Sequence, residues 1–239
     1  VSGEGSDDVK KDKNNLVIKA MMRGFEHMGQ KPKGIALRQL NVIPHGRGLG
    51  SSAAAIVGGL ALARALVLGG EQLLTDEEMI SLGTELEGHP DNISASFLGG
   101  FISSFMKDDV VRSVSYPINQ DLNFYVLIPN FNLSTKVARA ALPEKYLIED
   151  VVFSLSRAIQ LPYGFAQGDV KLLKDLLDDK IHEPYRFPLI KQALEIKDDF
   201  KDLEVAVSIS GAGPSILLIS KYSIEELNFD HIKYKDWNL

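Results

Sequence analysis

Residues 41–55 read NVIPHGRGLGSSAAA, in which three alternating glycines separate an apolar segment from two serines and three alanines. The apolar segment, residues 34–43, is expected to be a strand, and a long buried helix is expected to begin at about Ser52. The glycines, at positions 46, 48 and 50, can adopt positive φ and leave the backbone open to a ligand. Because N–H groups and the positive dipole end of the helix point into this loop, we predict an anion site, with phosphate as its commonest occupant.

The two serines after the glycines strengthen this interpretation, because the Ser51 and Ser52 hydroxyls can donate to a phosphate oxygen or bind Mg²⁺. Two familiar phosphate motifs do not fit. The loop lacks the GK[ST] ending of a Walker A motif, and GRGLGS lacks the last glycine of GxGxxG. A glycine-rich turn without a ligand is the alternative.

The composition limits the class of protein. The 239 residues are 45% hydrophobic and 24% charged, enough for a sizeable core in one or two domains. The net charge of -6, with no dominant basic segment, argues against a nucleic-acid partner. The absence of cysteine excludes disulfides and Cys-bound zinc. The most apolar run, residues 53–68, contains Gly58, Gly59 and Arg64 and is too short to span a bilayer, so we expect a cytoplasmic protein without a membrane partner.

Strands and helices alternate along the chain, which favours an α+β fold with two domains, residues 1–120 and 121–239. Residues 1–15 are expected to form a loop. Thr75 and Glu78 form a predicted capping box for a helix ending near Glu87, and Asn92 is a candidate cap for the next short helix. The other helices are expected at 16–28, 135–142, 148–165, 170–177 and 188–199, and the other strands at 101–105, 122–129, 203–208 and 216–219.

Three stretches together resemble the GHMP kinase superfamily: PHGRGLGSSAA at 44–54, EGHPDN at 87–92 and SGAGPS at 210–215. Within that superfamily, EGHPDN, STKVARAALP at 134–143 and HEPYR at 182–186 are most similar to the homoserine kinase family. The resemblance runs through most of the chain in the right order. It implies an N-terminal domain like ribosomal protein S5 domain 2 and a ferredoxin-like C-terminal domain.

The resemblance also implies an activity, which is transfer of the γ-phosphoryl group of ATP to the hydroxyl of L-homoserine, on the route to threonine. It further implies a homodimer. Another small-molecule GHMP kinase, such as a mevalonate-type enzyme, and a non-catalytic ligand sensor are the alternatives. The residues implied in ATP binding are Pro44, Gly46, Arg47, Gly48, Leu49, Gly50, Ser51, Ser52, Ala53, Gly211 and Gly213. Gly48 is expected where the backbone meets phosphate, so a valine there would block the nucleotide.

The same resemblance assigns Mg²⁺ to the Ser52 hydroxyl and a glutamate before HPDN. Glu85 and Glu87 both qualify, but they lie two apart and so face about 200° apart on a helix. We favour Glu87, which stands in the family-like string. One hydroxyl and one carboxylate suffice, since Mg²⁺ prefers hard oxygens and keeps several waters.

The implied substrate residues form two groups. His89, Asp91 and Asn92 lie in a turn at Pro90, where the family binds the hydroxyl and amino ends of the substrate. A His-x-Asp pair without a third ligand does not suggest zinc. The other group is Thr135, Arg139 and Arg186, where a guanidinium fork suits the α-carboxylate. The candidate catalytic residues are Ser52, Glu87 and Asp91. His182 is expected to pack or cap, and His27, His45 and His231 lie in no such pattern.

The family's first motif, near P-A-T-x-N-x-G-x-G-F-D, precedes a GEG-like stretch that resembles Gly3-Glu4-Gly5. This chain begins after that motif. We therefore expect it to lack the first segment of the N-terminal domain, which carries an Asp that contacts the substrate hydroxyl, and activity of the 239 residues alone is a separate question.

Overall fold

The computed structural model describes residues 1–227, 229–230 and 233–239, so His231 lies outside the described residues. Helices and strands are mixed, which confirms the predicted α+β class. The chain forms two compact units, one from Val1–Pro44 with Gly50–Tyr116 and the other from His45–Leu49 with Pro117–Leu239. The expected domain division after residue 120 stays a prediction. Within the described ranges, no helix combines the length and apolarity that a membrane crossing requires.

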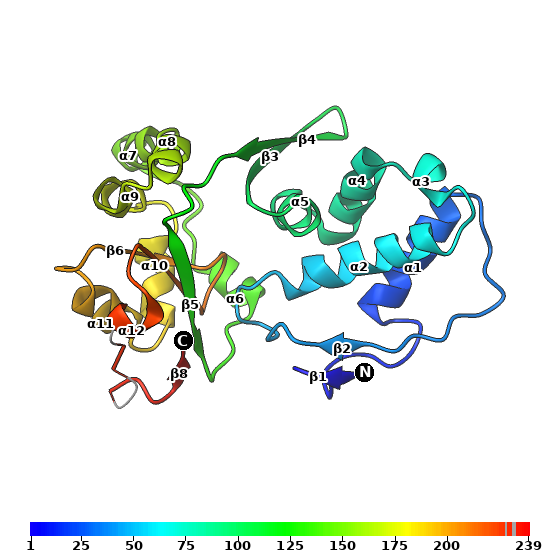
Figure 1. Cartoon of the computed structure of the whole chain (residues 1–239), viewed down its shortest axis with the longest axis horizontal. Helices are drawn as coiled ribbons and strands as arrows, with labels where there is room; N and C mark the ends of the chain where they lie inside the picture. The colour runs from blue at the N-terminus through cyan, green and yellow to red at the C-terminus, as the bar shows by residue number, and fades with distance from the viewer. Residues whose placement is uncertain (228, 231–232) are drawn as a thin grey trace. The chain divides into compact units, whose positions relative to one another are not determined.

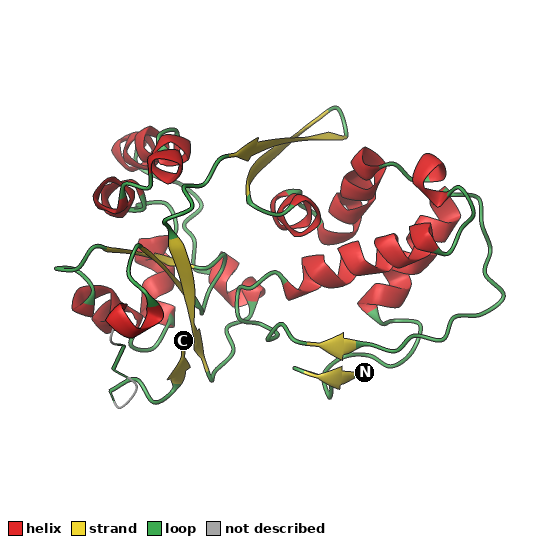
Figure 2. Cartoon of the chain, viewed as in Figure 1, coloured by secondary structure: helices red, strands yellow, loops and turns green. Residues whose placement is uncertain are grey.

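The first unit is mainly helical, with short strands (Figures 1 and 2). Its strands β1 and β2 pair in parallel, and β3 and β4 form an antiparallel hairpin. The helices are α1 (Leu16–His27), α2 (Ser51–Ala65), α3 (Gly70–Leu73), α4 (Asp76–Glu87) and α5 (Asp91–Leu98), and the strands are β1 (Ser2–Gly3), β2 (Leu40–Asn41), β3 (Phe101–Lys107) and β4 (Val110–Tyr116).

The core of this unit is the contact between α1 and α2, which lie side by side in Figure 1. Gly59 on α2 lets the helices approach closely, because a Cβ there would stand 2.6 Å from the Ala20 Cβ on α1. Ile56 and Leu60, both fully buried, fill the rest of the α2 face. The core therefore anchors α2 and fixes its first turn, which follows the glycines.

The predicted start and end of α4 are confirmed. Thr75 accepts from the Glu78 N–H while the Glu78 carboxylate accepts from the Thr75 N–H, as a capping box requires. Gly88 ends the helix at φ 94°, a conformation that favours glycine. The predicted Asn92 cap is wrong, because α5 begins at Asp91 and the Asp91 carboxylate accepts from the Asn92 N–H at 2.7 Å.

Two strand predictions in this unit need correction. Residues 34–43 were expected to form a strand, but among the residues that the structure describes only Leu40–Asn41 pair, with Ser2–Gly3. The hairpin strand β4 was not predicted, although Asp108 and Asp109 adopt the left-handed conformation that a two-residue hairpin turn needs. Both errors concern pairing between strands, which a single segment does not encode.

The second unit is built on an antiparallel sheet of four strands in the order β6-β7-β5-β8. Its strands are β5 (Asn123–Pro129), β6 (Val205–Ile209), β7 (Ile216–Ser220) and β8 (Trp237–Asn238). Its helices are α6 (Thr135–Ala140), α7 (Ile148–Ala158), α8 (Leu161–Gln167), α9 (Val170–Leu176), α10 (Glu183–Arg186), η1 (Phe187–Leu189), α11 (Ala193–Asp199) and α12 (Ile224–Leu227). The single helix predicted over 148–165 is two helices, because Pro162 cannot continue α7 and instead starts α8.

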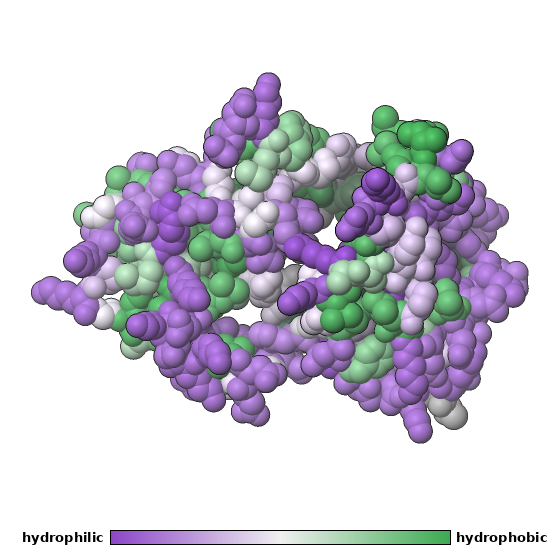
Figure 3. All heavy atoms as spheres, turned by 180° about the vertical axis from the view of Figure 1, so that it is seen from behind, coloured by the Kyte–Doolittle hydropathy of each residue, from purple (hydrophilic) through white to green (hydrophobic). Residues whose placement is uncertain are grey.

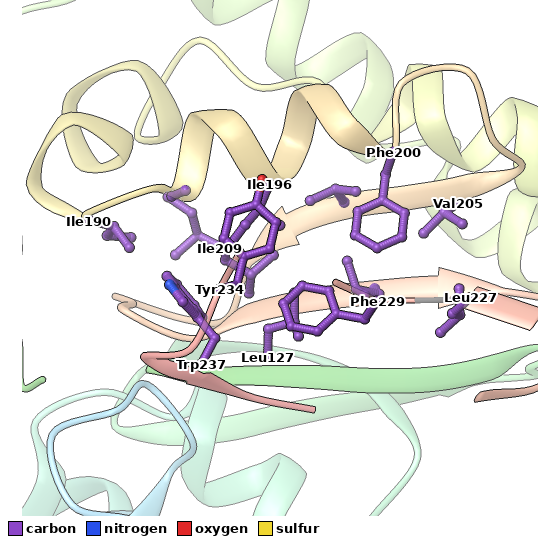
Figure 4. Packing of buried hydrophobic residues seen from close by; sticks show 14 of the residues in the cluster. Leu127, Ile190, Ile196, Phe200, Val205, Ile209, Leu227, Phe229, Tyr234 and Trp237 are labelled. Carbon is purple, nitrogen blue, oxygen red and sulfur yellow. The ribbon is translucent and has the colours of Figure 1, made fainter. Parts of the chain in front are cut away.

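Figure 4 shows the core of this unit, where α11 packs on the sheet. Ile196 of α11 and Phe200, which follows this helix, face Leu127 of β5 and Ile209 of β6, and all are nearly or fully buried. Trp237 from β8 closes one side. This packing fixes the end of β6, from which the second glycine loop leaves the sheet.

Helix α7 differs from the others because none of its residues is buried. Its apolar side chains recur every three or four residues and face solvent, forming a green patch in Figure 3. They are Ile148, Val152 and Leu155, followed by Ile159 just after the helix.

Candidate nucleotide and substrate site

The first glycine loop, Gly46–Gly50, has the backbone that the sequence predicts, with φ of 63°, 73° and 71° at its glycines. Within the second unit, its residues contact the second glycine loop, Ser210–Ser215. The Ser210 hydroxyl donates to the Gly48 carbonyl at 2.9 Å, and the Ser215 N–H donates to the Arg47 carbonyl at 3.3 Å. The two loops therefore abut.

The structure requires glycine at position 48 for a reason that differs from the expected contact with phosphate. A Cβ at position 48 would strike the carbonyl of Ser210 and stand 2.8 Å from the carbonyl of Gly213. Glycine is thus required there by the second loop, and a side chain would separate the two loops. Gly46 differs, since a Cβ there would only touch Asn132 at 3.5 Å.

The first turn of α2 follows Gly50, its N-cap residue, which has no side chain to cap the helix. The first intrahelical bond runs from the Ala54 N–H to the Gly50 carbonyl, at 2.9 Å. The N–H groups of residues 51–53 precede it, and such groups bind anions at the positive end of a helix. Ala53 is buried, Ser51 is half-buried and Ser52 is exposed, so the serine hydroxyls stand at the surface of this turn.

Ser52 and Glu87 are brought together, although 35 residues separate them. The Ser52 hydroxyl donates to a Glu87 carboxylate oxygen at 2.6 Å. Glu87 is half-buried at the end of α4, so a ligand can still reach the Ser52–Glu87 pair. Two neighbouring ligands of an octahedral Mg²⁺ with bonds of about 2.1 Å lie about 3.0 Å apart. The pair therefore fits Mg²⁺ after a shift of a few tenths of an ångström.

Glu85 does not join this pair. Arg23 of α1 donates to both its carboxylate oxygens, at 3.2 and 3.0 Å. The Arg23 guanidinium lowers the pKa of Glu85. The structure thus gives the two glutamates different partners, Arg23 for Glu85 and Ser52 for Glu87, and the choice of Glu87 as metal ligand stays a prediction. Among the described residues, no three His, Asp or Glu side chains gather in a way that could hold a metal.

His89, Asp91 and Asn92 lie together at the start of α5. One Asp91 oxygen contacts both the His89 ring nitrogen Nδ1 and the Asn92 N–H. Asp91 and Asn92 are exposed, and His89 is half-buried. The local contacts explain the shape of the turn, and the exposed polar groups leave it able to bind a small polar molecule.

Arg186 and Arg139 lie close together in the second unit. Arg186 Nε donates to the carbonyl of Ala138, the residue before Arg139, at 3.4 Å. Burial lowers the pKa of Arg186, and the charge of Arg139 lowers it further. Thr135 and Arg139 both stand exposed on α6, whose N-cap is Ser134. Two neighbouring guanidinium groups favour an anion between them.

Arg186 also contacts the second glycine loop, since its NH1 donates to the Gly211 carbonyl at 3.2 Å. Gly211 and Gly213, at φ 57° and 82°, shape this loop as the sequence predicts for glycine. The candidate carboxylate site and the second glycine loop are therefore connected by one side chain.

Glu183, the first residue of α10, was not among the residues predicted from the sequence. The residue is 2% exposed, and its carboxylate accepts from Ser208, Ile209 and Lys197. In the sequence, Glu183 could be seen as the second letter of HEPYR, three residues before the predicted Arg186. Its hydrogen-bond partners lie 14 to 26 residues away and could not be recognised from the sequence. His182 packs as expected, and burial lowers its pKa.

Comparison with known proteins matches both parts of the chain. The family model described as GHMP kinases N terminal domain matches residues 15–100, and that described as GHMP kinases C terminal matches residues 163–227. The chain belongs to the GHMP kinase family. This confirms the resemblance seen in the three glycine- and proline-containing motifs.

Relatives of this GHMP kinase carry a more specific name. A curated homoserine kinase from Caldicellulosiruptor bescii is 39% identical over 225 residues, which are 92% of this chain and 72% of the relative. One from Streptomyces coelicolor is 34% identical over 220 residues, or 92% and 71%. The crystal structure of homoserine kinase from Cytophaga hutchinsonii matches with a TM-score of 0.77 and 28% identity, over 94% of this chain and 72% of that one.

More distant structures share the fold alone. Phosphomevalonate kinase from Streptococcus pneumoniae matches with a TM-score of 0.65 and 14% identity, over 89% of this chain and 75% of that chain. The mevalonate-type alternative is therefore represented only by the more distant matches.

Proposed function

We propose that this GHMP kinase transfers the γ-phosphoryl group of ATP to the hydroxyl of L-homoserine, giving O-phospho-L-homoserine. The observation that carries the proposal is the Arg139–Arg186 pair, beside the second glycine loop in a chain whose relatives are named homoserine kinase. A planar guanidinium binds a carboxylate through two parallel hydrogen bonds. An amino-acid substrate supplies that carboxylate.

The glycine-rich segment Pro44–Ala53 is proposed to bind the ATP phosphates through its backbone N–H groups. The three left-handed glycines and the first turn of α2 support this role. Ser52 and Glu87 would hold Mg²⁺, with water as the remaining ligands. A bound Mg²⁺ would supply charge neutralisation for phosphoryl transfer. The presence of this hydroxyl–carboxylate pair argues for an enzyme over a ligand sensor.

The amino group separates homoserine from mevalonate, which also carries a carboxylate. Asp91 and Asn92 are the proposed acceptors for the ammonium group and neighbours of the hydroxyl, with His89 holding Asp91 in place. Thr135, one turn before Arg139 on α6, is the proposed neutral partner of the carboxylate. Homodimerisation and a cytoplasmic location stay predictions.

A coupled assay of ADP release tests the activity, with homoserine, mevalonate and galactose in parallel. It is run on the 239 residues and on the complete product of the gene. We expect turnover with homoserine alone. ATP binding without turnover of any acceptor by either protein would support a sensor, and faster turnover of mevalonate would overturn the substrate assignment.

Arg186→Leu tests how the substrate is held. The KM for homoserine should rise at least about tenfold, because a hydrogen bond to a charged group is worth about 1.5–3 kcal/mol. The matched control is Arg157→Leu, which removes an arginine of α7 that bonds the Asp175 carbonyl. Arg157→Leu should leave the KM for homoserine and the KM for ATP unchanged.

The alcohol 3-aminopropan-1-ol, which is homoserine without its carboxylate, completes a double-mutant cycle. The wild type should lose affinity for this analogue, whereas Arg186→Leu should lose little more, because the interaction is already gone. Equal losses in both proteins would place Arg186 outside the substrate site.

A further inference from the structure

We propose that Glu183 is a positioning residue that holds both glycine loops in their nucleotide-binding arrangement. The proposal rests on the proposed function for its nucleotide, and it concerns a residue that does not touch substrate. All the contacts that carry it lie within the second unit.

The position of Glu183 is fixed at the start of α10. One Asp179 carboxylate oxygen accepts from the N–H groups of residues 181, 182 and 183. Burial alone raises the pKa of Asp179, but the N–H groups of residues 181–183 together with the charge of His182 outweigh it, and the pKa is lowered. A charged cap thus anchors the turn from which the Glu183 side chain extends.

The Glu183 carboxylate contacts the last residues of β6. One oxygen accepts from the Ser208 hydroxyl at 3.0 Å and from the Ile209 N–H at 3.1 Å. Strand β6 is at the edge of the sheet, and the next N–H, that of Ser210, donates to Ser215 on the β7 side. The Ile209 N–H therefore points away from β7, toward Glu183.

The charge of Glu183 is compensated by Lys197 of α11, whose Nζ lies 3.0 Å from the other carboxylate oxygen. The Glu183 side chain is 3% exposed and that of Lys197 is 33% exposed. Burying a charge is costly, and a well-packed apolar pair often serves stability equally well. A role in fixing geometry explains why a carboxylate stands here.

The geometry it fixes is that of the second glycine loop. Glu183 holds the residue before the loop, and Arg186, one turn later on α10, holds Gly211 inside it. The loop in turn holds the first one through the bond from Ser210 to Gly48. α10 therefore contacts the second glycine loop and the residue before it through two side chains, and the second loop in turn positions the first glycine loop.

The test compares Glu183→Gln with Asp199→Asn by calorimetric titration with ATP and by amide hydrogen exchange. Asp199 is a matched control, because its carboxylate also accepts from a lysine and a hydroxyl, those of Lys233 and Tyr234. We expect Glu183→Gln to weaken ATP binding about tenfold, the equivalent of one hydrogen bond to a charged group. Exchange at the Ile209 and Ser215 amides should be faster. Asp199→Asn should leave both unchanged, even if it lowers the melting temperature.

A second variant, Glu183→Gln with Lys197→Met, avoids leaving a lysine without its carboxylate. If the single variant does not fold, ATP binding and amide exchange are measured on this double variant instead. Equal ATP affinity and unchanged Ile209 and Ser215 exchange in a folded variant would overturn the positioning role. A wild type that binds no ATP would refute the proposed function instead, and the exchange measurement would still decide the role of Glu183.

Discussion

Replacing Gly48 by alanine tests the contact between the two glycine loops. An added Cβ would strike the Ser210 carbonyl and stand 2.8 Å from the Gly213 carbonyl, both in backbone that cannot rotate away. The left-handed backbone at φ 73° adds strain of about 1–2 kcal/mol for any residue with a Cβ. Separating the loops further loses the Ser210–Gly48 hydrogen bond, worth about 0.5–1.5 kcal/mol.

The control is Gly46→Ala, in the same unit and at nearly the same φ of 63°. Its Cβ would make only an ordinary contact, 3.5 Å from Asn132. The conformational strain therefore cancels between the variants, and the difference reports the clash and the lost contacts. We expect Gly48→Ala to lose about 2 kcal/mol more unfolding free energy than Gly46→Ala, the sum of displaced backbone packing and one hydrogen bond.

Urea unfolding of both variants gives the comparison, with ATP titration as a second measurement. Gly48→Ala should also bind ATP more weakly than Gly46→Ala. Equal destabilisation of the two variants would refute the reasoning, because it would mean that strain at positive φ is the whole cost and that the loops do not depend on each other.

Three further predictions concern single carboxylates and a cap. Glu87→Gln should lower turnover at least about a hundredfold in the active enzyme while ATP affinity changes little, since metal-assisted charge stabilisation is worth several kcal/mol. The control Glu85→Gln, which removes the surface ion pair with Arg23, should leave turnover intact. Loss of turnover in Glu85→Gln but not in Glu87→Gln would reassign the metal ligand to Glu85. Because the pKa of Asp179 is lowered in the folded state, its stabilisation is present above the pKa of the unfolded state and is lost as pH falls through the folded value. Asp179→Asn should therefore flatten the fall of unfolding free energy below about pH 4. Thr75→Ala should cost about 1 kcal/mol in urea unfolding through loss of the capping box, and an unchanged midpoint would contradict the cap.

Features encoded locally were predictable from the sequence. The Thr75–Glu78 box lies within one turn of chain, and Gly46, Gly48 and Gly50 are required by backbone conformation that other residues rarely adopt. The same applies to the end of α4 at Gly88. The break between α7 and α8 at Pro162 belongs to this class, and reading the region as one helix overlooked a signal that was present.

Features that depend on distant partners were not predictable. Glu85 and Glu87 look alike in the sequence, and distant partners distinguish them: Arg23, 62 residues from Glu85, and Ser52, 35 residues from Glu87. Residues 34–43 have a strand-like pattern, but in the described part of the chain they form strand pairs only at Leu40 and Asn41, so the pattern alone was insufficient. The importance of Glu183 likewise depends on Ile209, 26 residues later.

The assignment of His45–Leu49 to the second unit has a consequence for how the protein is made. The chain passes between the units after Pro44, after Leu49 and after Tyr116, so no single cut separates them, and a fragment beginning at Pro117 lacks the partners of Ser210 and Ser215. During synthesis, Tyr116 is the last residue of the first unit to be added. The 94 residues that follow, up to Ser210, take roughly 5–20 s at ordinary ribosome speeds. The first glycine loop therefore remains without its partner through that interval, and the two loops can pair only after Ser210 and Ser215 have been added.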